Sequence, residues 1–322
     1  MGRRPKGCYH SPHATHGVTF QTARVAPMLR WRLFLGTLLI AALGILCWLD
    51  GMAPIPGLWL FPVALVFVIA ATNEVLYLAA LAGGRPLAST VYTGNILLLV
   101  SSWVPIFWAR AADALPSAPS GTWPLLALAL GVPLVFTGEM YRFQKAGNGA
   151  TMNVGIGVFT IVYVGLLVSL LAQLRIQWGI WALVSLLVVV KLGDVGAFTV
   201  GRLLGRHKIA PTLSPGKTVE GAVGALVFAC AGSWVTFQWL IPWTTSAPEN
   251  PSPWWGWILF GLLVGTAGMV GDLAESLMKR DAGAKDSSHW MPGFGGVLDL
   301  LDSVLLAAPV GWLCWALGVV GY

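Results

Sequence analysis

Residues 254–276 read WWGWILFGLLVGTAGMVGDLAES, an apolar stretch that carries no charged residue before Asp272. A helix needs about 20 apolar residues to cross the hydrocarbon core of a bilayer, so this stretch predicts a membrane-spanning helix. Similar apolar runs fill most of the remaining chain and lie at residues 33–49, 57–81, 91–108, 122–138, 150–171, 178–200, 221–243 and 297–321. The sequence therefore predicts an all-α, polytopic integral membrane protein with about nine transmembrane helices.

The amino-acid composition agrees with this class and excludes a water-soluble enzyme. Of the 322 residues, 57% are hydrophobic and only 10% are charged, whereas a soluble domain carries about 25% charged residues. If the N-terminus is cytoplasmic, sixteen of the 19 Lys and Arg residues fall in cytoplasmic loops, the usual positive-inside pattern. We therefore predict a cytoplasmic N-terminus, a location in the inner (cytoplasmic) membrane of the cell, and no nucleic-acid partner.

Acidic residues are distributed unevenly and indicate where function lies. Most of the 13 Asp and Glu residues lie between Asp194 and Asp302, and charge within a membrane is costly and usually functional. We predict a basic, disordered cytoplasmic tail (residues 1–32) and an N-terminal transmembrane scaffold (33–180). A C-terminal catalytic region (181–322) follows, with cytoplasmic loops at 201–220 and 277–296.

Three charged residues inside the predicted spans have two readings each. Lys191 and Asp194 are three positions apart, so they form a structural ion pair or, through Asp194, line a polar cavity. Glu74 is either a hydrogen-bond partner between helices or a carboxyl kept protonated by burial. Spacing alone places none of the three in the catalytic centre.

The last two predicted helices carry acids at helical spacing. Asp272, Glu275, Ser276 and Lys279 follow an i, i+3, i+4, i+7 pattern and share one helix face. Asp299 and Asp302 open the final helix after a glycine-rich turn, which brings Asp299 back towards Asp272. Carboxylates backed by Lys and Arg suit divalent cations that carry phosphate groups. The alternative is a set of charge pairs that tie the helices together.

The loop before residue 221 is rich in groups that bind phosphate. Gly216-Lys217-Thr218 is similar to the end of a Walker A motif, but Pro211 stands where that motif requires glycine. A P-loop is therefore excluded, and a basic loop that merely follows the positive-inside pattern is an equal alternative. The polar residues that remain are Arg202, Arg206, Lys208, Ser214, Lys217, Thr218 and Glu220.

Several ordered motifs between residues 191 and 303 match one family signature. They are Asp194 to Phe198, Ser214-Pro215-x-Lys217-Thr218-x-Glu220-Gly221, Gly271-Asp272, Ser276, Lys279-Arg280, Lys285-Asp286, Pro292 to Gly296, and Asp299 with Asp302. In these positions the chain resembles the phosphatidate cytidylyltransferases, also called CDP-diacylglycerol synthases. Two residues depart from the family pattern: Phe294 replaces a His, and Leu300 replaces an Arg. Neither can supply the hydrogen bonds of the residue it replaces.

The resemblance implies transfer of a cytidylyl group from CTP to phosphatidate, which yields CDP-diacylglycerol and pyrophosphate for phospholipid synthesis. It also implies a homodimer. From the carboxylate pattern and the charge of the triphosphate we predict one or two Mg²⁺ ions on Asp272 and Asp299, with Asp302 as a further candidate. The expected catalytic residues are Lys217, Lys279, Arg280, Lys285 and Asp286. The expected substrate-binding residues are Ser214, Thr218, Glu220, Ser276, Arg206 and Lys208.

Three other functions compete with this one. A related CTP-dependent transferase would act on another lipid phosphate or on a polyprenol-type alcohol, and the alcohol would need a general base. An ion-coupled transporter would place its acids near the middle of the membrane on broken helices. A weakly active paralogue is suggested by Phe294 and Leu300.

Overall fold

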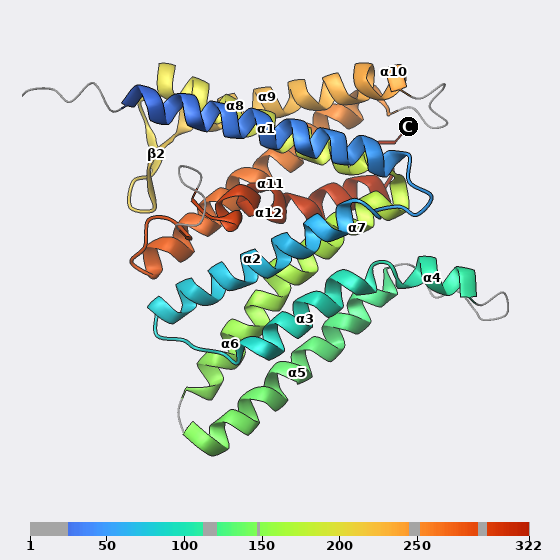
Figure 1. The fold of residues 1–322 in the computed structure, drawn as a ribbon. Helices are drawn as coiled ribbons and strands as arrows, with labels where there is room; N and C mark the ends of the chain where they lie inside the picture. The colour runs from blue at the N-terminus through green and yellow to red at the C-terminus, as the bar shows by residue number, and fades with distance from the viewer. Residues whose placement is uncertain (1–24, 112–120, 147–148, 245–251, 289–294, 322) are drawn as a thin grey trace, which may run out of the picture.

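The computed structural model describes residues 25–111, 121–146, 149–244, 252–288 and 295–321 (Figure 1). Most of the predicted basic tail lies outside the described residues, and so does Phe294. The N-terminal half contains α1 (Val25–Gly51), α2 (Leu60–Leu81), α3 (Ala88–Ser101), α4 (Val104–Ala111), α5 (Thr122–Ala146), α6 (Ala150–Thr160), η2 (Ile161–Leu166) and α7 (Leu167–Trp178). The C-terminal half contains α8 (Ile180–Leu204), β1 (Lys208–Ala210), β2 (Ser214–Thr218), α9 (Val219–Val235), η3 (Thr236–Leu240), α10 (Ile241–Thr244), α11 (Trp254–Asp281) and α12 (Val297–Ala316).

The all-α, polytopic class is confirmed. Among the described residues, 7 helices are long and apolar enough to cross a membrane: Leu60–Leu81, Thr122–Lys145, Ala150–Trp178, Ile180–Leu204, Val219–Thr244, Trp254–Asp281 and Val297–Ala316. The predicted runs 33–49 and 91–108 coincide with shorter apolar helices. The second run breaks because α3 ends at Ser101 and Pro105 enters the first turn of α4, where proline is tolerated. Nine spans and a cytoplasmic N-terminus remain predictions.

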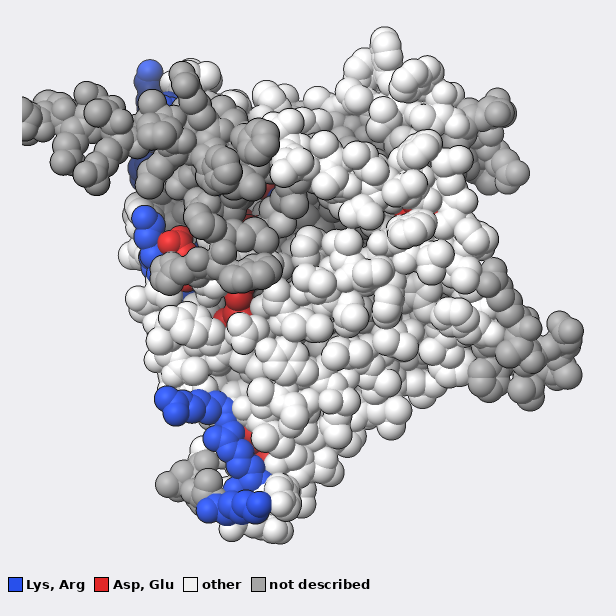
Figure 2. All heavy atoms as spheres, viewed as in Figure 1, with Lys and Arg blue, Asp and Glu red and all other residues white. Residues whose placement is uncertain are grey.

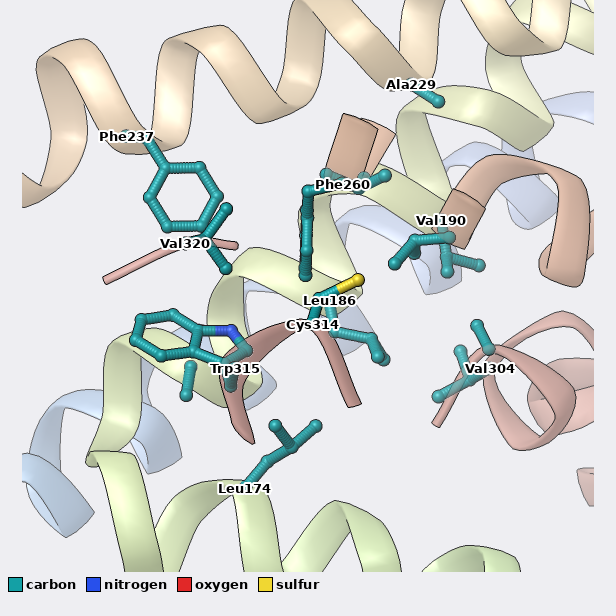
Figure 3. Packing of buried hydrophobic residues seen from close by; sticks show 14 of the residues in the cluster. Leu174, Leu186, Val190, Ala229, Phe237, Phe260, Val304, Cys314, Trp315 and Val320 are labelled. Carbon is teal, nitrogen blue, oxygen red and sulfur yellow. The ribbon is translucent and has the colours of Figure 1, made fainter. Parts of the chain in front are cut away.

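The helix α12 lies at the centre of the described fold. Figure 1 shows α11 and α12 between α8 and α9 on one side and α2 and α7 on the other. Of the apolar window in α12, 61% is buried, against 50% or less in the other spans. One core cluster joins it to α8, α9 and α11 and contains Phe237 and Phe260, whose ring centroids lie 5.5 Å apart (Figure 3). A second cluster joins it to α2, α3 and α7.

A short β-hairpin connects α8 to α9, where the sequence predicted only a loop. Strands β1 and β2 are antiparallel, and Lys208 pairs with Thr218. Thr218 then caps α9, because its Oγ1 accepts a hydrogen bond from Gly221 N at 3.1 Å. In Figure 1 the hairpin lies at the left edge of the view, and Figure 2 shows Lys and Arg side chains gathered along the same edge.

A buried ion pair joins the end of α1 to the end of α7. Arg175 Nε lies 2.5 Å from Asp50 Oδ2, and the side-chain exposures of the two residues are 10% and 0%. The Asp50 carboxylate also accepts hydrogen bonds from Gly57 N at 3.1 Å and Trp59 N at 3.0 Å. These contacts fix the turn between α1 and α2 against the end of α7.

Candidate active site

Three carboxylates from two helices meet in one cluster. Asp272 and Glu275 lie one turn apart on α11, and Asp302 lies on the first turns of α12. One ligand atom from each residue lies within 4.8 Å of the other two. Glu275 is 1% exposed and Asp302 is 7% exposed. We call these three residues the acidic cluster.

A close helix crossing brings the cluster together. At Gly271 an added Cβ would overlap the backbone oxygen of Asp302, so α11 and α12 approach here only because residue 271 has no side chain. One turn earlier, a Cβ on Gly268 would find its nearest atoms at 3.7 Å, which is ordinary contact. The crossing is therefore tightest directly beside Asp272.

The hairpin places a lysine beside the acidic cluster. Lys217, on β2, places its Nζ 2.9 Å from Asp272 Oδ2. Arg280, at the end of α11, holds the hairpin in turn, because its Nε donates to Leu213 O at 3.2 Å. Two of the predicted cations thus link the hairpin to α11.

Asp299 lies beside the acidic cluster and holds a second lysine. Lys279 Nζ lies 2.5 Å from Asp299 Oδ1 and 2.5 Å from Glu275 Oε2. The other oxygen of Asp299 accepts from Ser287 Oγ at 2.6 Å and from Gly296 N at 2.7 Å. Asp299, predicted as a metal ligand, is therefore bonded to protein groups through both oxygens.

Glu74 in α2 takes the first of its two predicted roles, a hydrogen-bond partner between helices. Its carboxylate accepts from Val297 N at 2.9 Å and from Leu298 N at 2.7 Å, at the start of α12. Ser288, in the segment before α12, donates to it at 2.8 Å, and Ser287 Oγ lies 3.0 Å from it. A residue of the range 33–180 thus reaches the edge of the candidate site.

The remaining predicted residues lie farther from the cluster or face solvent. Glu220 bonds to the loop itself, since it accepts from Arg206 N at 3.0 Å and contacts His207 Nδ1 at 2.6 Å. Ser276 is buried on α11 and Ser214 is half-buried at the start of β2. The side chains of Arg206, Lys208, Lys285 and Asp286 are exposed.

The pairing of Lys191 with Asp194 is confirmed, with Nζ 3.1 Å from Oδ2. The pair sits on α8 next to the site: Lys191 also donates to Leu300 O at 3.3 Å, and Ser303 Oγ donates to Asp194 at 3.4 Å. Both side chains are about half exposed, at 46% and 44%. An exposed pair within a span is costly in lipid, so it fits a polar space beside α12.

Sequence reasoning assigned no role to Glu275, Ser287 or Ser288. The i+3 spacing from Asp272 already placed Glu275 on the same face, and that spacing was the available signal. No local pattern marks the two serines, because their partner Glu74 lies in α2, more than 200 residues earlier.

The acidic cluster fits a divalent cation. Oε1 of Glu275 is buried and has no hydrogen-bond partner among the described residues. Three carboxylates this close repel one another unless positive charge lies among them, and carboxylate oxygens are the ligands that Mg²⁺ prefers. Lys217 and Lys279 contact the cluster from its edges.

A helical membrane protein with a carboxylate cluster flanked by lysines belongs to the class of proteins that can bind phosphate groups through a metal ion. The particular family follows from comparison: the chain belongs to the cytidylyltransferase family, whose family model matches residues 30–317. The chain is 34% identical to a phosphatidate cytidylyltransferase of Chlamydia pneumoniae over 240 residues, which cover 71% of this chain and 73% of the relative.

Two further relatives carry the same name. A phosphatidate cytidylyltransferase of Mycobacterium bovis is 30% identical over 264 residues, covering 80% of each chain. One from Synechocystis is 30% identical over 289 residues, covering 79% of this chain and 87% of the relative. The family resemblance predicted from the motifs is therefore confirmed.

Proposed function

We propose that this protein is a phosphatidate cytidylyltransferase, which transfers a cytidylyl group from CTP to phosphatidate and releases CDP-diacylglycerol and pyrophosphate. The family and the names of its relatives support this activity. The observation that carries it is the acidic cluster with Lys217 and Lys279 at its edges, on helices long enough to span a bilayer.

The reaction joins two polyanions, so charge neutralisation is its main requirement. An oxygen of the phosphatidate phosphate attacks the α-phosphorus of CTP and forms a new P–O bond. The bond from that phosphorus to the bridging oxygen breaks, and pyrophosphate leaves with the electron pair. A phosphate monoester has a second pKa of about 6, so the nucleophile is already anionic and needs no strong general base. The replacement of a family His by Phe294 is compatible with such a step.

The proposed role of each site residue follows from its position in the structure. Asp272, Glu275 and Asp302 would hold Mg²⁺, which when bound supplies positive charge to the triphosphate. Asp299, predicted as a ligand, instead orients Lys279, and Lys217 approaches from the hairpin. Lys279 and Lys217 neutralise phosphate charge. The exposed cations Arg280, Lys285, Arg206 and Lys208 attract CTP to this end of the molecule.

The polar groups of the loops orient the nucleotide. The Thr218 hydroxyl accepts from Gly221 N and still has its proton to donate to a phosphate oxygen. Ser214, Ser276, Glu220 and Asp286 complete the proposed substrate-binding and catalytic set. The acyl chains of phosphatidate remain in the bilayer beside the helices.

The sidedness and assembly of the enzyme are part of the proposal. The basic edge that carries the hairpin (Figure 2) faces the cytoplasm under the positive-inside rule, so CTP enters from that side of the inner membrane. The protein acts as a homodimer, as the family resemblance implies.

The test uses purified full-length protein, labelled CTP and phosphatidate in mixed micelles. Labelled CDP-diacylglycerol should form with Mg²⁺ and stop when EDTA is added. Parallel reactions with a polyprenol or a different lipid phosphate separate the related transferases. A protein that labels only these other acceptors, or none, contradicts the proposed substrate. Complementation of a conditional synthase deficiency tests the same activity in cells.

A further inference from the structure

Glu74 contacts α12 in a way that the proposed catalytic assignments do not use. Its side chain, in α2, is only 3% exposed. Oε1 accepts hydrogen bonds from Val297 N at 2.9 Å and Ser288 Oγ at 2.8 Å. Oε2 accepts from Leu298 N at 2.7 Å and lies 3.0 Å from Ser287 Oγ, whose single proton is shared between Glu74 and Asp299. All four donors belong to the start of α12 or to the segment that precedes it.

These hydrogen bonds satisfy two kinds of polar group that are costly to bury without partners: the first amides of α12 and the Glu74 carboxylate. The first amides of a helix have no partner within the helix, and a buried carboxylate needs donors around it. The positive end of the helix dipole also favours a carboxylate. Gly296 N is bonded to Asp299, so the three amides from Gly296 to Leu298 are all occupied by the carboxylates of Glu74 and Asp299. The start of α12 is therefore held by the protein and is not free to bind a substrate phosphate.

The Ser287 hydroxyl connects Glu74 to the candidate active site. Its Oγ lies 3.0 Å from Glu74 Oε2 and 2.6 Å from Asp299 Oδ2. Asp299 in turn holds Lys279, which contacts Glu275 of the acidic cluster. An unbroken series of polar contacts thus runs from α2 to the cluster.

The backbone at Gly296 leaves room for this arrangement. A Cβ at this position would overlap both the Ser287 hydroxyl and the Glu74 carboxylate. The backbone conformation itself is extended, with φ −106° and ψ 176°, so other residues could adopt it. Glycine is required here for space, because the two side chains occupy the position where a methyl group would lie.

We infer that Glu74 is a positioning residue for the transfer site: it fixes the start of α12 and, through Ser287, the orientation of Asp299 and Lys279. The effect of Glu74 on turnover rests on the proposed function. Glu74 touches no reacting group in this scheme, so its loss should lower kcat more than it raises KM for CTP.

The experiment compares Glu74→Gln with a matched control, Glu139→Gln. Glu139, on α5, is 2% exposed and also accepts from a backbone amide, Leu87 N at 2.6 Å, and from Asn153 Nδ2 at 3.3 Å. A purely structural role for both acids predicts similar losses of thermal stability and similar kcat in the two variants. Positioning by Glu74 predicts a kcat loss in Glu74→Gln alone.

We expect Glu74→Gln to lower kcat at least about tenfold, with KM for CTP changed by less than about threefold, as for the loss of outer-shell support. Hydrogen exchange of residues 295–303 should rise at least about fivefold, because one of the two amides that donate to Glu74, Val297 N or Leu298 N, loses its acceptor and the start of α12 loosens. Glu139→Gln should change neither quantity. Equal kcat losses in both variants, or unchanged exchange at 295–303 in Glu74→Gln, would overturn the inference.

A second variant keeps the inference testable if Glu74→Gln does not fold. Ser287→Ala removes the hydroxyl shared by the two carboxylates, and it should show the same loss of kcat with little change in KM. Wild-type kcat in this variant would count against the inference. If the wild-type protein transfers no cytidylyl group, the proposed function fails by itself, and the exchange measurement alone then decides whether Glu74 positions α12.

Discussion

Asp272 lies between a positive charge on one side and two carboxylates on the other. The Lys217 ammonium lies 2.9 Å from one of its oxygens, whereas Glu275 and Asp302 lie on the side of the acidic cluster. Lys217 and Lys279 bring two positive charges to three carboxylates, and Lys279 is shared with Asp299, so the cluster gains from a bound cation. Among the described acids, Asp272 is also the only one that joins the cluster directly to the hairpin.

Replacing Asp272 with Asn should therefore abolish most transfer activity. The amide keeps the size of the side chain but loses the charge that attracts Mg²⁺ and Lys217, and we expect a loss of at least about 100-fold in kcat. Asp281→Asn is the control, because Asp281 is exposed at the end of the same helix. Activity of purified Asp272→Asn within tenfold of wild type would refute its assignment as a ligand.

The buried pair of Asp50 and Arg175 should contribute stability and not chemistry. Asp50→Asn leaves the Arg175 guanidinium buried without its counter-charge, which typically costs about 3–5 kcal/mol. Denaturation of the purified protein should report this loss, while kcat per folded molecule stays near wild type. The double variant Asp50→Asn/Arg175→Met should recover part of the stability, because no unpaired charge remains. A double variant no more stable than the single one would contradict this account.

At the scale of elements, the approach of α11 to α12 sets the geometry of the acidic cluster. Gly271→Ala should push the helices apart at Asp302, lowering both thermal stability and kcat, the latter by about tenfold or more. Gly268→Ala, one turn away on the same helix, should be tolerated, because its methyl group meets atoms at 3.7 Å. Steady-state assays and thermal denaturation of both variants test this contrast. Equal effects in the two variants would show that the crossing at Gly271 does not control the site.

Most helices could be predicted from the sequence, but the hairpin and the helix ends could not. In lipid a single span must satisfy its backbone groups internally, and it does so as a helix with apolar side chains. Hydropathy alone therefore locates a span such as 254–276. The segment from Lys208 to Thr218 has no alternating pattern and forms strands through pairing with itself and contact with Arg280. The break after Ser101 had only Pro105 as a signal.

The sequence grouped Asp272, Asp302 and Lys217 in one site although they lie on different elements, but it did not give the partner of each carboxylate. Helical spacing placed Asp272 and Glu275 on one face. The same spacing paired Asp299 with Asp302, yet in the structure Asp302 turns to the acidic cluster and Asp299 to Lys279. Which carboxylate faces which partner depends on how α12 is rotated against α11, and no local sequence pattern reports that rotation.

For the whole molecule, the sidedness of the membrane gives a direct prediction. The span Val219–Thr244 begins at the hairpin and is long enough to carry Thr244 to the opposite surface. In a variant without the native cysteines, an impermeant maleimide should label Thr244→Cys in intact cells. It should label Thr212→Cys only in inside-out vesicles. The reverse pattern would place the candidate active site outside the cell and refute entry of CTP from the cytoplasm.

The contact between Glu74 and α12 also has a consequence for biogenesis. Its backbone partners lie up to 224 residues later in the chain, a distance that a ribosome covers in roughly 11 to 45 s. Until α12 is inserted, α2 carries an acidic side chain whose helix-end donors do not yet exist. A chain truncated before residue 295 would keep that acid without its backbone donors permanently, so it should insert less stably than the full chain.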